Sequence, residues 1–203
     1  MWEPKSLADQ PTPGHTETGW EDLLEPLRRP LVEASGNGWA LNAKLLISGP
    51  AAWSTLTMPG SYGDIGYTLR LKIRQMDPED GLSVILPVGS AHAVFDLERN
   101  PQQGRITTLN LDGRESATVP GAVKGKQIKD REPHDLELTV QRSGADVRFE
   151  SQMDGHPLFQ WSGPASSLGL PKEWGAIPPG HLGLGSFRSD WVVCEVKVKR
   201  LEK

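Results

Sequence analysis

The chain has 203 residues, a net charge of −4 and a single cysteine, Cys194. This balance excludes a global basic field for nucleic acid or an anionic membrane, and one cysteine excludes an intrachain disulfide or a cysteine metal cluster. No apolar run approaches the roughly 20 residues that span a bilayer, and residues 1–19 lack the basic and apolar regions of a signal peptide. We therefore expect no nucleic acid partner and no membrane insertion, and the compartment is left unassigned.

The first part of the chain has the composition of a linker. Residues 1–18 are rich in Pro and Thr and hold one aromatic residue, Trp2, so they bury too little surface to order themselves. We expect a flexible tail over 1–18 and a single β-sandwich domain over 19–203. Such a tail is typical of a module in a larger protein, whose other domains would then be partners. Within 19–31 the leucines have helical spacing, but two prolines limit any helix to a turn or two.

Strand patterns fill the rest of the chain, because apolar and polar residues alternate with a period of two. The predicted strands lie in 39–48, 52–59, 66–76, 81–89, 91–99, 104–113, 134–144, 145–155, 157–163, 180–188 and 190–203. Residues 81–89 are apolar on both faces and are expected to form a central strand. So many short strands joined by Gly and Pro turns predict an all-β protein built as a two-sheet antiparallel sandwich. Strand content should exceed about 40%, and helix should stay below about 10%.

Several segments, in this order, resemble the jelly roll of the concanavalin A-like lectin/glucanase superfamily. They are YTLRLKIR, DGLSVILPVG, a strand with FDL, the tract HDLELTVQRSGADVRFESQMDGHPLFQWSG and the closing HLGLGSFRSDWVVCEVKVKRL. The resemblance covers roughly residues 36–201 and is to laminin-G-like and 3-keto-disaccharide-hydrolase-like bacterial domains. It implies a concanavalin A-like fold and a non-catalytic carbohydrate-binding or adhesion module. Function depends on sites that such a fold carries, so a glycoside hydrolase and a purely structural protein-interaction domain stay open as alternatives.

Two residues are expected to be structural. Trp161 lies two positions after Phe159, on the same face of a predicted strand, and such a pair is more typical of a core than of a binding platform. Cys194 lies in the alternating segment 190–203, which favours a buried thiol.

Carboxylates are the natural candidates for catalysis. Jelly-roll glycosidases commonly place their carboxylates on one strand as E-x-D-x-E, and neither this motif nor E-x-D-x-x-E occurs in the sequence. The nearest pairs are Asp96 with Glu98 and Asp135 with Glu137, each on one face of a strand. Asp96, Glu98 and Glu137 are therefore the catalytic candidates for a hydrolase, although an ordinary solvated sheet face is the favoured explanation of each pair.

A polar face is the first candidate for ligand binding. Its members are Arg70, Lys72, Arg74, His92 and Asp96. The three basic residues share one side of a strand, and we expect the other two on a neighbour one or two strands away. Such a groove would offer hydrogen bonds to the hydroxyls of a sugar, or to a carboxylate or sulfate on a glycan. The alternative is an ordinary solvated face.

Aromatic rings that stack on sugars would have to come from loops. The candidates are Trp53, Tyr62 and Trp174.

The sequence predicts no cofactor. The five histidines show no ligand spacing for a transition metal. A structural calcium is common in related sandwiches, and the loop carboxylates that could contribute to one are Asp112, Asp154 and Asp190.

Overall fold

The computed structural model of the chain describes residues 18–27, 38–42, 45–49, 51–77, 79–112, 114–115 and 117–202. Strands account for 54% of the described residues and helices for 8%, which confirms the predicted all-β class. The tail expected over 1–18 lies outside the described residues except for Thr18. No helix in the described ranges is long and apolar enough to cross a membrane.

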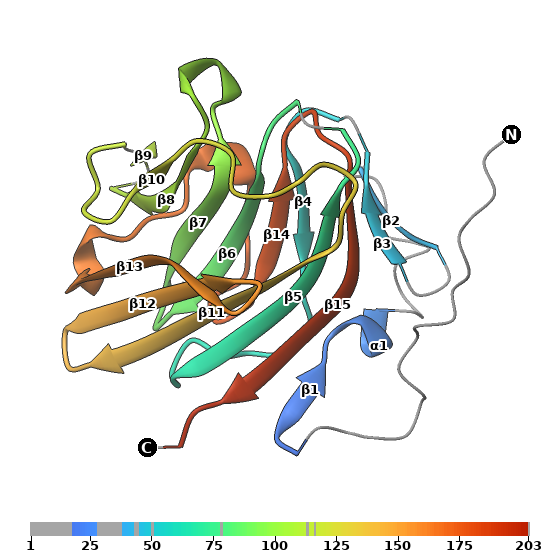
Figure 1. The fold of residues 1–203 in the computed structure, drawn as a ribbon. Helices are drawn as coiled ribbons and strands as arrows, with labels where there is room; N and C mark the ends of the chain where they lie inside the picture. The colour runs from blue at the N-terminus through green and yellow to red at the C-terminus, as the bar shows by residue number, and fades with distance from the viewer. Residues whose placement is uncertain are drawn as a thin grey trace, which may run out of the picture.

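Two antiparallel sheets form the described structure (Figure 1). The larger sheet has the order β13 (His156–Pro164), β12 (Asp146–Met153), β11 (His134–Ser143), β5 (Tyr67–Gln75), β15 (Trp191–Arg200), β3 (Leu45–Ser48), β2 (Trp39–Asn42), with β1 (Trp20–Asp22) also paired to β15. The smaller sheet has the order β10 (Val123–Lys124), β8 (Ile106–Leu111), β7 (Ala91–Arg99), β6 (Leu82–Val88), β14 (Gly183–Ser186), β4 (Ser54–Thr57), with β9 (Arg114–Glu115) paired to β8. The described helices are short: α1 (Leu24–Leu27) and the 3₁₀ turns Pro101–Gln103, Ala165–Ser167 and Lys172–Trp174.

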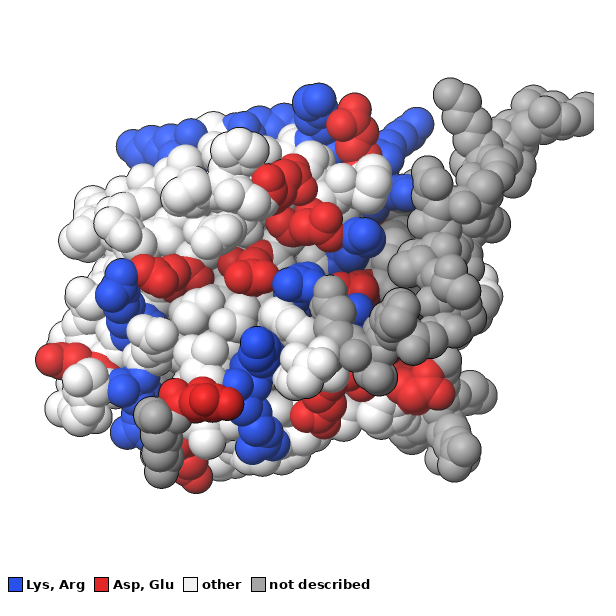
Figure 2. Space-filling model, turned by 60° about the horizontal axis from the view of Figure 1, so that its bottom comes forward, with Lys and Arg blue, Asp and Glu red and all other residues white. Residues whose placement is uncertain are grey.

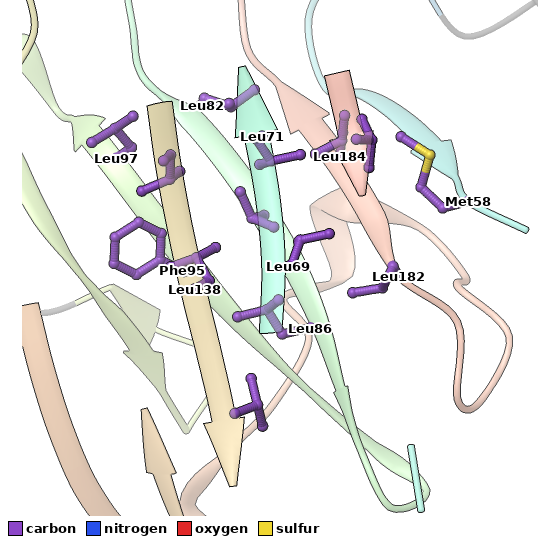
Figure 3. Close-up of a cluster of buried hydrophobic side chains, with 14 of the residues drawn as sticks. Met58, Leu69, Leu71, Leu82, Leu86, Phe95, Leu97, Leu138, Leu182 and Leu184 are labelled. Atoms are coloured by element: carbon purple, nitrogen blue, oxygen red, sulfur yellow. The ribbon is translucent and has the colours of Figure 1, made fainter. Parts of the chain in front are cut away.

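The core lies between the sheets, where their alternating apolar side chains meet (Figure 3). Leu69 and Leu71 reach it from β5, and Phe95 and Leu97 reach it from β7. Each side chain of this kind contributes roughly 1.5–3 kcal/mol when fully buried. The apolar residues that recur at every second position of the strands therefore form the inner face of each sheet.

Strand β6 is buried along its whole length, as its sequence predicts, because it is covered on both faces. Its outer residue Ile85 packs with Val94, Trp174 and Ile177 in a second, smaller apolar cluster. Trp174 and Ile177 belong to the segment 170–177, which packs on the outer side of the smaller sheet. The part of the sheet around Ile85 and Val94 therefore lies between the main core and this segment.

Trp161 is buried, as predicted, and its ring centroid lies 5.9 Å from that of Phe149. Cys194 is only half-buried, so the prediction of a buried thiol is wrong. The reason is a register shift between Val193 and Glu195, which leaves Cys194 as an extra residue that interrupts the alternation of β15.

Candidate functional site

The predicted polar groove does not form. Arg70 belongs to β5 in the larger sheet, whereas His92 and Asp96 belong to β7 in the smaller one. The connection after β5 crosses the sandwich instead of returning beside β5, whose neighbours are β11 and β15. His92 and Asp96 are also buried, so they cannot join Arg70 in a wet groove.

The basic residues of β5 take part in a cross-strand ladder of opposite charges. Arg70 pairs with Glu137 at 3.4 Å, and Lys72 pairs with Asp135 at 3.7 Å. Trp20 of β1 stacks on the Arg70 guanidinium, 4.3 Å from its carbon to the ring centroid. Figure 2, which brings the lower side of Figure 1 forward, shows acidic and basic side chains interspersed across the centre of that face. Exposed pairs of this kind contribute about 0–1 kcal/mol each, so the geometry favours a solvated face.

The three candidate catalytic carboxylates are not presented together at a surface. Asp96 is buried and accepts a hydrogen bond from the Ser83 hydroxyl. Glu137 lies in the larger sheet and is ion-paired with Arg70. A glycosidase needs two carboxyl groups about 5–9.5 Å apart on a surface that the substrate reaches, whereas Asp96 and Glu98 are buried and Glu137 lies in the other sheet.

Glu98 is fully buried, and its donors come from the chain itself. Its carboxylate accepts hydrogen bonds from the backbone N–H of Gln127 and, at 2.7 Å, of Ile128, and it pairs with Arg105 at 3.3 Å. These contacts attach the loop around 125–128 to the end of β7. The arrangement is that of a structural carboxylate.

The calcium candidates lie in three different surroundings, and no group of three or more metal-binding side chains occurs among the described residues. Asp112 is an exposed turn residue. Asp154 accepts hydrogen bonds from His134 Nδ1 at 2.7 Å and from the Asp135 N–H at 2.9 Å. Burial, together with the charge of Asp77, raises the pKa of Asp190.

Two of the three aromatic candidates come together. The ring centroids of Trp53 and Trp174 are 5.0 Å apart in an edge-on arrangement. Trp53 is 39% exposed, whereas Trp174 is 3% exposed and packs beneath it. Tyr62 is 1% exposed and its ring packs against Tyr67, so it cannot stack on a ligand.

A third ring and a buried arginine complete this cluster, which we call the Trp53 platform: Trp53, Trp174, Phe187 and Arg99. The ring centroids of Trp53 and Phe187 are 4.6 Å apart. The Arg99 guanidinium lies 5.4–5.7 Å from the centroids of all three rings. The platform is therefore a continuous set of rings around one cation.

The strand order explains why these residues meet. Trp53 precedes β4, Phe187 follows β14 and Arg99 ends β7. Because β4, β14, β6 and β7 are antiparallel neighbours, the start of β4 and the ends of β14 and β7 lie at the same end of the smaller sheet. Sequence reasoning missed Phe187 and Arg99, because nothing in their local patterns indicates which strand ends coincide.

Arg99 is held in place from its other side. It is buried and lies 3.6 Å from Asp80, and Asp80 accepts hydrogen bonds from the N–H of Gly81 at 2.7 Å and of Asn100 at 3.2 Å. A buried cation is tolerated when it is paired in this way. The platform thus rests on a fixed ion pair, with Trp53 as its exposed member.

No family model and no curated protein matches the sequence. Solved structures do match. The carbohydrate-binding module CBM66 from Bacillus subtilis has a TM-score of 0.51 and 12% identity over 90% of this chain and 96% of that one. A legume lectin-like domain from Entamoeba histolytica has a TM-score of 0.56 and 10% identity over 82% and 88% of the chains. Winged bean acidic lectin, in complex with methyl-α-D-galactose, has a TM-score of 0.52 and 9% identity over 82% and 92%.

At these identities the likeness concerns the fold alone. The chain shares the concanavalin A-like jelly-roll fold with these structures, which confirms the fold that the sequence resemblance implied.

Proposed function

We propose that the chain is a non-catalytic carbohydrate-binding module and that it binds a glycan at the Trp53 platform. The observation that carries the proposal is the exposed indole of Trp53, which two other rings and the Arg99 guanidinium hold in one orientation. An aromatic face packs well against the apolar face of a sugar ring. A side chain that is already ordered loses little conformational entropy when a ligand binds.

The comparisons support this role without assigning it. The solved structures with this fold include a carbohydrate-binding module and lectins. Binding without hydrolysis fits the surroundings of the platform, where the carboxylates Asp80 and Glu98 are each engaged by an arginine and by backbone N–H groups. A carboxylate occupied in this way is poorly placed to activate water or protonate a glycosidic oxygen.

The test is a glycan array followed by calorimetric titration of the sugars that bind. Trp53→Ala should weaken binding about tenfold or more, because it removes an aromatic anchor. Trp20→Ala is the matched control: Trp20 is a half-buried tryptophan in the other sheet, stacked on Arg70. Equal affinity in both variants would overturn the proposed site. If no glycan binds and a protein partner is captured, the chain is an interaction domain, and release of reducing ends from a bound glycan would show a hydrolase.

A further inference from the structure

We infer that the Trp53 platform is selective for acidic glycans, with Arg188 binding a carboxylate or sulfate on the sugar that lies beside Trp53. The inference rests on the proposed function, because it specifies the class of ligand at the same site.

Arg188 is next to the platform in space. Its guanidinium carbon lies 5.1 Å from the ring centroid of Phe187, and the Phe187 ring lies 4.6 Å from that of Trp53. Arg188 is exposed. Only the Phe187 ring therefore separates the exposed Arg188 guanidinium from a sugar that covers Trp53.

The two other arginines near this end of the sheet are already paired. Arg99 is paired with Asp80, and Arg105 is paired with Glu98. Among the described residues, Arg188 forms no ion pair. Its guanidinium is therefore available to a ligand.

The backbone fixes the position of Arg188 relative to Trp53. Both residues have left-handed backbone conformations, with φ of 48° at Arg188 and 56° at Trp53. The N–H of Arg188 donates a hydrogen bond to the carbonyl of Ala51 at 3.1 Å, which joins the two loops. Non-glycine residues in this region persist only where the surrounding structure holds them there, and they cluster at binding sites.

The chemistry of guanidinium suits such a ligand. Its N–H donors lie in the plane of the group, so stacking on Phe187 leaves its edge available for two parallel hydrogen bonds. Carboxylate and sulfate oxygens accept bonds in this geometry. A neutral sugar would gain only single hydrogen bonds from the same group.

Calorimetric titration with three hexasaccharides tests the inference. Hexagalacturonate carries carboxylates, a κ-carrageenan hexasaccharide carries sulfates, and maltohexaose is neutral. At low salt, at least one acidic probe should bind about tenfold more tightly than maltohexaose, and added salt should weaken that preference. The acidic probe that binds identifies the group recognised.

Two arginine variants then test whether Arg188 causes the preference for the acidic probe. Arg188→Gln should abolish the preference for the acidic probe, whereas the affinity for maltohexaose should fall much less, because a neutral sugar loses only single hydrogen bonds. Arg200→Gln is the matched control, because Arg200 is also exposed and its guanidinium lies 5.1 Å from an aromatic ring, that of Tyr62. Equal losses in both arginine variants, or no binding of either acidic probe, would overturn the inference. Loss of maltohexaose binding in Trp53→Ala, with an unchanged preference in Arg188→Gln, would overturn the role of Arg188 and leave the proposed binding module intact.

Discussion

The ring of Trp174 lies directly against Gly185 of β14, so closely that a Cβ atom on that residue would be 2.6 Å from the ring. Glycine at 185 thus lets the segment 170–177 approach the sheet and place Trp174 beneath Trp53. Gly185→Ala should push Trp174 outward and reduce the free energy of unfolding by about 1–3 kcal/mol, the usual cost of overpacking. Urea denaturation followed by tryptophan fluorescence measures both effects.

Gly49→Ala is the control for this substitution. A Cβ at Gly49 would come no closer than 3.6 Å to any neighbour, and its φ lies outside the left-handed region. Its free energy of unfolding should therefore change little. A Gly185→Ala protein as stable as Gly49→Ala, with unchanged fluorescence, would contradict the packing role of Trp174.

Glu98 is predicted to stabilise the fold and to take no part in chemistry. Glu98→Gln removes a charge that two backbone N–H groups and Arg105 share, so the free energy of unfolding should fall by about 2 kcal/mol or more. Glu137→Gln, which alters a pair at the surface, should cost less than about 1 kcal/mol. Thermal and chemical denaturation give the two values. A stable Glu98→Gln protein that has lost a hydrolytic activity of the parent would reverse this assignment.

The sequence predicts more of the fold than of the site. Alternation identifies the strands and their inner faces, because burial of one face requires a period of two. It does not determine which sheet a strand joins. The prediction that Arg70 and Asp96 line one groove is wrong because their strands belong to different sheets. Trp53 and Trp174 were candidates individually, but their contact depends on strand order over more than half the chain. Cys194 was placed wrongly because a bulge has no signature in local alternation.

Asp154 should make stability depend on pH in the acid range. Burial alone would raise its pKa, but the hydrogen bonds from the Asp135 N–H and from His134 outweigh burial and lower that pKa. A carboxyl group with a lowered pKa stabilises the fold above its unfolded pKa of about 3.9, and this contribution is lost as pH falls through the folded pKa. Asp154→Asn should therefore be less stable than the parent at pH 7, by about 1 kcal/mol or less because the carboxylate is largely exposed.

The pH dependence distinguishes this effect from a packing defect. The difference between Asp154→Asn and the parent should shrink as the pH is lowered from about 5 to 2, because the parent then loses the same charge. Urea denaturation at a series of pH values measures it. A deficit that stays constant over this range would show that the hydrogen-bonding geometry, and not ionisation, is what the substitution removes.

Substitutions of Arg99 and Trp53 should distinguish the residue that holds the platform in place from the residue that contacts the ligand. Arg99→Lys keeps the positive charge beside Asp80 but removes the planar group that lies over three rings, and lysine does not replace arginine at a stacked, buried site. We expect it to lower the free energy of unfolding by about 2 kcal/mol and to weaken glycan binding about threefold to tenfold, because Trp53 is then less firmly held.

Trp53→Ala should weaken binding at least as much while changing stability by less than about 1 kcal/mol, since the side chain is 39% exposed. Calorimetric titration and denaturation of both variants test the two effects together. If Arg99→Lys reduced affinity with no loss of stability, Arg99 would itself contact the ligand, and the guanidinium would belong to the binding surface instead of its support.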